Sequence, residues 1–258
     1  MTSPILVTGG TGTLGRHVVP LLREAGRDVR VLSRHARPSG DGVEYVTADL
    51  LKDEGIESAV DGVEIVLHLA GGPKGDDEAT RNLVRAARRA GVRHLVYISV
   101  IGADKIPLGY FRSKLGAEQA VAGSGLPWTT LRAAQFHDLM LTVTEKMAKL
   151  PVIPAPGGVR LQPVDPREVA ARLVELTLGA PAGLVPDLAG PTVYGMADLA
   201  RAYLKARGKH RPMLPVRMPG KAGRAYRAGE NLSLTGATTG KRTWEDFLTE
   251  RVPQHAGR

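Results

Sequence analysis

Three glycines spaced three residues apart follow the first apolar run of the chain. The run Ile5–Thr8 predicts a short strand, and an amphipathic helical segment begins soon after it. Gly9, Gly12 and Gly15 lie between the two. Gly9 permits a tight turn, Gly12 lets backbone N–H groups approach a diphosphate, and Gly15 lets the helix pack on the strand. In a chain with 31 glycines the spacing alone is weak evidence, but its position between strand and helix predicts a dinucleotide-binding loop.

The end of the second predicted strand carries a cation and no acidic residue. Ser33 is followed there by Arg34. An NAD site commonly places an acidic side chain at this point to hold the ribose hydroxyls, whereas a 2′-phosphate requires a cation. Arg34, aided by Arg16 and Arg37, can form a forked hydrogen bond with such a phosphate. The sequence therefore predicts NADP(H) as the cofactor in preference to NAD(H).

Further predicted cofactor contacts come from the loops that follow the third and fourth strands. Asp49 and Leu50 can frame the adenine. Ala70, Gly71 and Gly72 offer a floor without large side chains beside the central ribose, although turn formation alone is the alternative explanation for the two glycines. The cofactor-binding residues predicted from all these loops are Thr8, Gly9, Gly12, Thr13, Leu14, Gly15, Arg16, Ser33, Arg34, Asp49, Leu50, Ala70, Gly71 and Gly72.

These loops need a parallel sheet to bring them to one edge, and the first half of the chain has the matching pattern. Short apolar runs alternate with helical segments, which is typical of parallel strands joined by crossover helices. The predicted strands are Ile5–Thr8, Val29–Ser33, Val43–Thr47, Ile65–Ala70, His94–Ser99 and Trp128–Arg132. The predicted helices are Thr13–Ala25, Glu54–Val60, Asp77–Ala90 and Phe111–Ala122. The predicted fold class is α/β, with a doubly wound parallel sheet of the Rossmann type.

The pattern changes near residue 150. Three prolines and two glycines within residues 151–158 predict a loop. Asp165, as a helix cap, and Pro166 predict the start of a helix that ends at Leu178. Short strands near Leu184–Pro186 and Met213–Val216 and helices near Ala197–Ala206 and Thr243–Arg251 follow. We predict an NAD(P)-binding domain over residues 1–150, with strand contributions to about residue 165, and a small α+β substrate-covering lobe over residues 151–258.

Composition excludes several kinds of site. The 258 residues include no cysteine, which excludes disulfides, thiolate metal sites and cysteine nucleophiles. The seven histidines form no His-x-x-x-His pair, so no metal site is predicted. No Gly-x-Ser-x-Gly turn follows a strand, which argues against a serine hydrolase. Neither a signal peptide nor an apolar stretch of about 20 residues is visible, so we expect a cytoplasmic protein without membrane contact.

The formal net charge of +9 raises the question of a nucleic-acid partner. Aromatic residues make up only 4% of the chain and are not interleaved with the basic ones. The densest basic group, Arg81, Arg85, Arg88 and Arg89, has the spacing of the solvated face of an amphipathic helix. We therefore predict a small-molecule substrate and no nucleic-acid partner, and the oligomeric state, a homo-oligomer included, stays open.

The glycine spacing, with Thr8 ahead of it, resembles the short-chain dehydrogenase/reductase superfamily. The resemblance is to its extended and atypical branches, particularly the NmrA-like group of NAD(P)-binding proteins, and covers the chain from Ile5 to Val169. It implies an active-site Tyr-x-x-x-Lys after the fifth strand, and Tyr110 and Lys114 have this spacing. It further implies that Tyr110 delivers a proton during hydride transfer to a carbonyl. Lys114 would lower the pKa of the phenol and hold the nicotinamide ribose, as a catalytic and cofactor-binding residue.

One part of the sequence departs from the pattern of this superfamily. The resemblance implies a Ser or Thr after the fifth strand that polarises the substrate carbonyl. Ser99 is the predicted residue, whereas the register of the extended members places this hydroxyl at Ile101, which has none. After the sixth strand, Gln135, Phe136 and His137 resemble the segment that covers the nicotinamide. These three are the predicted substrate residues, with a solvated loop position as the alternative for His137.

Together these residues predict an NADPH-dependent oxidoreductase that reduces a carbonyl or conjugated double bond of a small organic molecule. The alternative is an NADP-binding redox sensor without turnover, because many NmrA-like relatives have incomplete sites. A nucleotide-sugar epimerase or dehydratase is less favoured, since the C-terminal region is short for a nucleotide-sugar lobe and the hydroxyl cluster typical of those enzymes after the fifth strand is missing. Residues Gln162–Asp165 resemble the junction where the chain returns to the sheet.

Overall fold

The computed structural model describes residues 3–72 and 74–252, which form two compact units. The first unit comprises the described parts of Met1–Ser99, Gly109–Arg132 and Arg167–Val185. The second unit comprises the described parts of Val100–Leu108, Ala133–Pro166 and Pro186–Arg258. Each unit therefore draws on three separate stretches of the chain.

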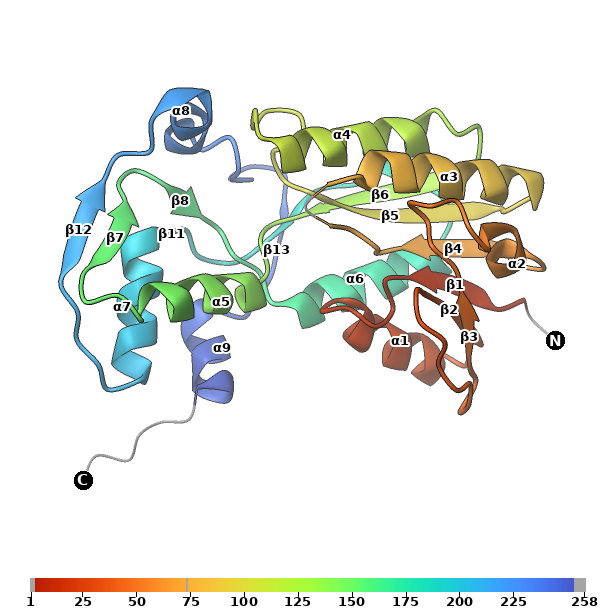
Figure 1. Ribbon diagram of the computed structural model, residues 1–258, viewed down its shortest axis with the longest axis horizontal. Helices are drawn as coiled ribbons and strands as arrows, with labels where there is room; N and C mark the ends of the chain where they lie inside the picture. Colours follow the sequence, from red (N-terminus) through yellow and green to blue (C-terminus); the bar gives the residue numbers. More distant parts are fainter. Residues whose placement is uncertain (1–2, 73, 253–258) are drawn as a thin grey trace. The chain divides into compact units, whose positions relative to one another are not determined.

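The first unit is built on a parallel sheet with the order β6–β5–β4–β1–β2–β3, with β9 paired to β6 (Figure 1). Its strands are β1 (Ile5–Thr8), β2 (Val29–Ser33), β3 (Val43–Thr47), β4 (Ile65–His68), β5 (His94–Val100), β6 (Trp128–Ala133) and β9 (Gly183–Leu184). Strand β1 pairs in parallel with both β2 and β4, so the strand order reverses at β1. Ligands of such sheets bind at the carboxyl ends of the strands beside this reversal.

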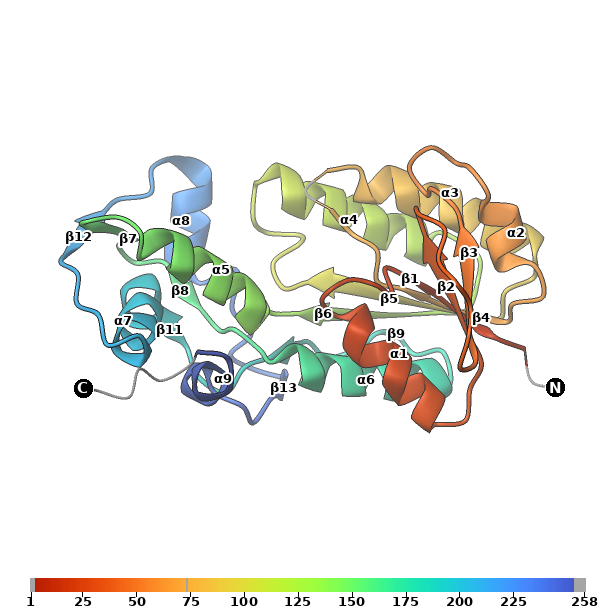
Figure 2. The same cartoon turned by 60° about the horizontal axis from the view of Figure 1, so that its bottom comes forward.

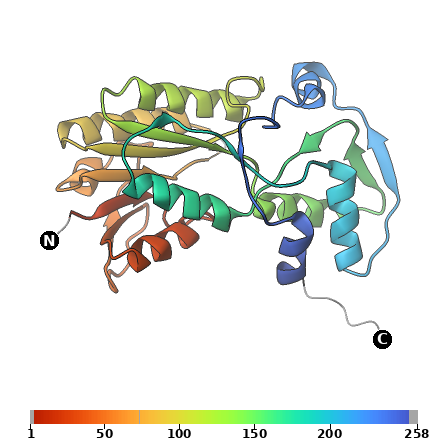
Figure 3. The ribbon, with the colours of Figure 1, turned by 180° about the vertical axis from the view of Figure 1, so that it is seen from behind.

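Helices cover both faces of this sheet (Figures 1 and 2). The helices are α1 (Gly15–Glu24), α2 (Ile56–Val60), α3 (Asp76–Arg89), α4 (Gly109–Ala122) and α6 (Pro166–Leu178). Helices α3 and α4 lie together on one face, and Figure 3 shows α1 and α6 together on the other. Buried aliphatic side chains such as Leu6, Leu83 and Leu95 fill the space under α3. The predicted doubly wound α/β fold is confirmed.

The second unit contains short strands and four helices within the part of the chain that the structure describes. The helices are α5 (His137–Met147), α7 (Met196–Ala206), α8 (Gly220–Ala228) and α9 (Trp244–Arg251). The strands are β7 (Ile153–Pro156), β8 (Arg160–Leu161), β10 (Leu188–Ala189), β11 (Tyr194–Gly195), β12 (Met213–Val216) and β13 (Thr238–Thr239). Strand β10 pairs with β13 and with Ala133 at the end of β6. Trp244, Phe247 and Leu199 are buried in the core of this unit.

The predicted strands of the first unit agree with the structure to within two residues at each end, whereas the second half differs more. Helices α5 and α8 and the short strands β8, β10, β11 and β13 were not predicted. The proline-rich segment predicted as a loop contains β7, which pairs in parallel with β12. The backbone N–H groups of Ile153 and Gly157 donate hydrogen bonds to the segment that contains β12. Pro154 and Pro156 take the alternate positions. A proline at an alternate position of a strand with one partner needs no N–H group, so the prolines do not break this strand.

The two compact units also divide the chain differently from the single boundary predicted near residue 150. Residues Arg167–Val185 belong to the first unit, because β9 adds to the sheet beside Thr129 and Thr130 of β6. In the described residues, no helix has the length and apolar character needed to cross a bilayer. The same residues contain no group of three or more His, Asp or Glu side chains that could hold a metal ion.

Candidate functional site

The glycine loop between β1 and α1 makes close backbone contacts at two of its three predicted glycines, and the contact of Gly15 is with the loop itself and not with the strand. Gly9 has a φ of +70°, and a Cβ atom there would lie 2.7 Å from the backbone nitrogen of Ala70. A side chain at Gly15 would collide with the backbone of Gly10. The Gly12 N–H donates to the Gly9 carbonyl at 3.0 Å and so closes the turn. The loop therefore lies tightly between α1 and the end of β4.

The outer side of this loop is open. A Cβ atom added at Gly12 would find only the Gly9 carbonyl oxygen, at 3.2 Å, within 4 Å. Thr11, Gly12 and Thr13 are all exposed. A loop without side chains that leads into the N-terminus of a ten-residue helix suits a diphosphate, because backbone N–H groups and the helix dipole attract the anion. The shape and donor chemistry of the loop thus fit a dinucleotide.

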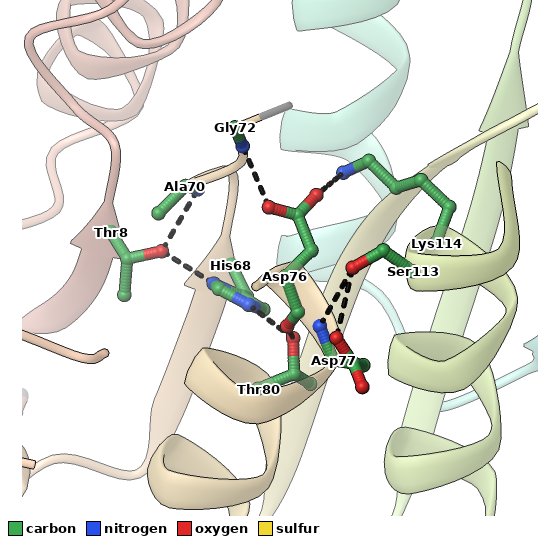
Figure 4. Close-up of polar contacts among 9 residues, drawn as sticks. All are labelled: Thr8, His68, Ala70, Gly72, Asp76, Asp77, Thr80, Ser113 and Lys114. Carbon is green, nitrogen blue, oxygen red and sulfur yellow. Dashed lines mark hydrogen bonds and ion pairs between the residues drawn. The ribbon is translucent and has the colours of Figure 1, made fainter. Parts of the chain in front are cut away.

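A chain of hydrogen bonds ties this loop to the start of α3 through a buried histidine (Figure 4). The Ala70 N–H donates to Thr8 Oγ1 at 3.1 Å, and Thr8 Oγ1 lies 2.6 Å from His68 Nδ1. His68 Nε2 lies 3.0 Å from Thr80 Oγ1, whose hydroxyl donates to the Asp76 carbonyl at 2.6 Å. Since the Thr80 hydrogen is used there, His68 Nε2 must donate to Thr80. In a neutral imidazole with its proton on Nε2, Nδ1 accepts from the Thr8 hydroxyl.

The surroundings of His68 agree with this neutral form. Burial, with a smaller contribution from the Lys114 ammonium, lowers the pKa of His68 to about 3. The imidazole stacks on the Tyr97 ring with centroids 5.3 Å apart. Protonation would remove the acceptor that Thr8 requires and would place a charge in an apolar surrounding. His68 therefore acts as a fixed, uncharged link between β1, β4 and α3.

A buried ion pair lies beside the loop that follows β4 (Figure 4). Lys114 Nζ on α4 lies 3.0 Å from Asp76 Oδ2 on α3, and both side chains are less than one-tenth exposed. The other carboxylate oxygen of Asp76 accepts from the Gly72 N–H at 2.6 Å. A Cβ atom at Gly71 would lie 3.0 Å from Lys114 Nζ and 3.1 Å from Asp76 Oδ2. The glycine pair thus lets the loop backbone lie directly against the ion pair.

The packing of α4 on β5 puts the predicted residues Ser99, Tyr110 and Lys114 on the same side of the sheet. Lys114 Nζ lies 5.3 Å from the centre of the Tyr97 ring, so this ring faces α4. Alternate residues of a strand share a face, which places Ser99 on the same side of β5 as Tyr97. Helix α4 runs back along the crossover from β5 to β6, so Tyr110, one turn before Lys114, lies toward the carboxyl end of β5.

The hydroxyls of Ser99 and Tyr110 differ in their surroundings. Ser99 is 4% exposed, and its Oγ atom has no hydrogen-bond partner among the described residues. A buried hydroxyl without a partner is uncommon in folded proteins and suits a position where a bound molecule supplies the partner. Tyr110 is 40% exposed, and its ring meets Phe111 edge-on with centroids 5.4 Å apart. The phenol is therefore accessible from solvent.

A second acidic residue, Asp77, fixes α4 against α3 close to the ion pair. The Ser113 hydroxyl donates to Asp77 Oδ1 at 2.9 Å (Figure 4). A Cβ atom at Gly116 would lie 2.8 Å from the Asp77 Cβ, so the helices approach closely because Gly116 has no side chain. Asp77 also pairs with the exposed Arg81. Asp76 and Asp77 are thus neighbours in sequence with different partners.

The residues predicted at the ends of β2 and β3 have mixed surroundings. Arg34 is exposed at the end of β2, whereas Ser33 is buried and its hydroxyl donates to the His35 carbonyl at 2.8 Å. Asp49 Oδ1 accepts from the backbone N–H groups of residues 51 and 52, so the carboxylate closes a turn. Leu50 is 6% exposed. Of these residues, Arg34 offers its side chain freely to a ligand from solvent.

The predicted substrate residues Gln135, Phe136 and His137 belong to the second unit. Gln135 and Phe136 are half-buried. His137 is fully buried at the start of α5, with ring centroids 5.2 Å from Phe247 and 5.8 Å from Trp244. Burial lowers the pKa of His137 to about 4, which keeps the ring neutral. This is the environment of a core residue and not of a solvated loop position, and the substrate role of His137 stays a prediction.

The sequence pointed to Lys114 but missed His68 and Asp76. His68 stands inside an apolar run that reads as a buried strand, and Asp76 precedes the predicted start of α3. Acidic residues are common at helix N-termini because they interact favourably with the helix dipole. Nothing local therefore distinguishes Asp76 from Asp77. Only the packing of α3 against α4 and β4 identifies their different partners.

Comparison with known proteins gives relatives of similar sequence and similar fold. The chain is 36% identical over 183 residues to (4-alkanoyl-5-oxo-2,5-dihydrofuran-3-yl)methyl phosphate reductase of Streptomyces griseus. The matched region covers 68% of this chain and 63% of the relative, which is less than two thirds of the relative's length. It is 28% identical over 214 residues to quinone oxidoreductase 2 of Escherichia coli, covering 80% of this chain and 75% of the relative.

The fold is shared with solved structures as well. The NADPH-dependent quinone oxidoreductase of Escherichia coli in complex with NADPH has a TM-score of 0.81 at 22% identity, covering 96% of this chain and 99% of that one. The sequence profile of the NAD(P)H-binding family matches residues 9–176, which is more than half of the chain and contains the glycine loop, His68, Asp76 and Lys114. The chain belongs to the NAD(P)H-binding family.

Proposed function

We propose that the protein is an NADPH-dependent oxidoreductase that reduces a carbonyl or conjugated double bond of a small organic molecule. The observation that carries the proposal is the position of Lys114 against the backbone of Gly71, at the carboxyl edge of the sheet where the strand order reverses. The glycine loop after β1 fits a diphosphate at the same edge. A bound cofactor would therefore extend from the glycine loop past Gly71 toward Lys114.

The cofactor preference follows from the end of β2. Arg34 is exposed there, and no acidic residue takes the place that would favour an unphosphorylated ribose. Arg34 would hold the 2′-phosphate, aided by Arg16 on α1. Ala70, Gly71 and Gly72 would form the floor beneath the central ribose. We therefore propose NADP(H) in preference to NAD(H), within a family whose shared property is NAD(P)H binding.

On the substrate side, bound NADPH would supply the hydride, and the residues of α4 and β5 would hold and protonate the acceptor. Ser99 would donate its unused hydroxyl hydrogen bond to the substrate oxygen. Tyr110 would donate the proton that balances the charge arriving with the hydride. The names of the two relatives refer to a 5-oxo-2,5-dihydrofuran and to quinones, so conjugated carbonyl compounds are the first substrates to test.

The first experiment is a fluorescence titration of the purified protein with NADPH and NADH. A screen for NADPH oxidation against quinones, enones and ketones follows it. We expect tighter binding of NADPH than of NADH, turnover with at least one conjugated acceptor, and loss of turnover in Tyr110→Phe with cofactor binding retained. Failure to bind either cofactor would refute the proposal, and unchanged turnover in Tyr110→Phe would refute the role of Tyr110.

A second candidate function, an NADP-binding redox sensor without turnover, has one observation in its favour. The Asp76 carboxylate 3.0 Å from Lys114 offsets the positive charge that would assist proton transfer from Tyr110. Tight NADPH binding without oxidation in the presence of any acceptor of the screen would favour the sensor. A change in the binding of a protein partner between NADPH and NADP⁺ would then identify its output.

A further inference from the structure

The buried carboxylate of Asp76 has contacts that the proposed reaction does not yet use. One oxygen pairs with Lys114 and the other holds the backbone of Gly72. The Asp76 main-chain carbonyl ends the hydrogen-bond chain that starts at the glycine loop and passes through His68 and Thr80. Asp76 therefore contacts the Gly72 backbone directly, and the hydrogen bonds through Thr80 and His68 connect it to Thr8 before the glycine loop.

We propose that Asp76 is a positioning residue, which fixes the direction of the Lys114 ammonium group and holds the Gly71–Gly72 backbone in place for the cofactor. The proposal rests on the proposed function, because it assumes that the cofactor passes this loop. Asp76 itself contacts no reacting atom. It acts through Lys114 and through the loop backbone.

The charges around the pair explain why Asp76 is needed. Lys114 is 7% exposed, and burying an ammonium group to this degree costs free energy unless a close counter-charge accompanies it. The neighbour of Lys114 on β5 is the Tyr97 ring, and its neighbour on β4 is the neutral His68. Burial raises the pKa of Tyr97 well above its usual range, so this phenol supplies no negative charge.

The other acidic groups near the pair have partners of their own. Glu118 on α4 forms a forked pair with Arg132 through hydrogen bonds of 2.8 and 2.7 Å. Asp77 on α3 is bonded to Ser113 and Arg81. Among the described groups that face Lys114, Asp76 is thus the carboxylate within ion-pair distance of the ammonium group.

Asp76→Asn separates the two roles of this side chain. The remaining amide oxygen still accepts from the Gly72 N–H, while the new NH₂ group faces the Lys114 ammonium. Without its counter-charge the buried ammonium group loses the ion pair that fixes its direction. Asp77→Asn is the matched control, because it makes the same chemical change one residue away on the same helix without contact to Lys114.

The first measurement is the NADPH dissociation constant of wild type, Asp76→Asn and Asp77→Asn at pH 7. We expect the Asp77→Asn value to follow wild type. For Asp76→Asn, we expect the dissociation constant to rise by about tenfold, because Lys114 loses the charged hydrogen-bond partner that directs it toward the cofactor. Equal dissociation constants for the two Asn variants would overturn the proposal.

The second measurement needs no cofactor and covers the case in which Asp76→Asn folds poorly. Thermal unfolding of Asp76→Asn, Lys114→Met and the double variant forms a mutant cycle. Each single variant leaves one buried partner alone, whereas the double variant removes both charges. We expect the double variant to unfold at a higher temperature than the sum of the single effects predicts, and strict additivity would overturn the pairing. If wild type binds no NADPH, the proposed function fails while this cycle still tests the pair.

Discussion

The neutral, buried His68 predicts a specific dependence of stability on pH. In the folded protein the pKa of His68 is lowered to about 3, whereas an unfolded histidine has a pKa near 6.5. Between these values the unfolded chain binds one more proton than the folded chain at this site. The free energy of unfolding therefore falls as the pH falls through 6.5, and this loss continues until about pH 3.

The size of the effect follows from the same two pKa values. Between pH 7 and pH 5, the His68 contribution lowers the free energy of unfolding by about 2 kcal/mol. His68→Gln removes the titration and keeps a donor that reaches toward Thr80, although it loses the acceptor for Thr8. We expect the variant to be less stable than wild type at pH 7 by about 1–2 kcal/mol, because of the lost hydrogen bond.

The assay is urea unfolding at pH 7 and pH 5 for wild type, His68→Gln and the control His35→Gln, whose side chain is exposed. His137, with a pKa of about 4, and His94, with a lowered pKa, also weaken the fold in acid, so all three proteins lose stability at pH 5. Between pH 7 and pH 5, we expect the free energy of unfolding of wild type and of His35→Gln to fall by about 2 kcal/mol more than that of His68→Gln. Equal losses in all three proteins would refute the assignment of His68 as a buried, neutral link.

Three further outcomes follow from the geometry of the site. Gly9→Ala adds a Cβ atom 2.7 Å from a backbone nitrogen at a φ of +70°, so we expect a loss of about 1–3 kcal/mol in urea unfolding and weaker NADPH binding. Arg34→Ala is expected to raise the NADPH dissociation constant by about 10-fold or more and to leave that of NADH unchanged, and an equal effect on both would contradict the 2′-phosphate contact. Ser99→Ala is expected to lower kcat by about 100-fold with the NADPH dissociation constant unchanged, and an unchanged kcat would exclude Ser99 from the reaction.

The parts of the site that the sequence predicted are those whose signals are local. Gly9 and Gly15 stand in a short turn between a strand and a helix, and the structure has the turn and close backbone packing at both glycines. The placement of Lys114 one turn after Tyr110 needs only the period of a helix. The superfamily resemblance then supplied their roles, which the geometry alone does not test.

The parts that the sequence missed depend on contacts between distant segments. His68 reads as one more residue of a buried strand, and its function as a link needs Thr8, sixty residues earlier, and Thr80. His137 reads as a loop residue beside the cofactor, yet it begins a helix and packs against Phe247 and Trp244. Periodicity reports which residues are buried and not which side chains they meet.

The sequence by itself determined the order of strands and helices in the first half of the chain, the parallel sheet and the location of the dinucleotide loop. These features follow from the alternation of apolar residues and from glycines at positions where a side chain would clash. Tertiary structure alone decided that Asp76 rather than Asp77 pairs with Lys114, and that His68 is neutral. Burial gives these polar groups their effect, because a charge or hydrogen bond removed from water depends entirely on the partners that the fold brings to it.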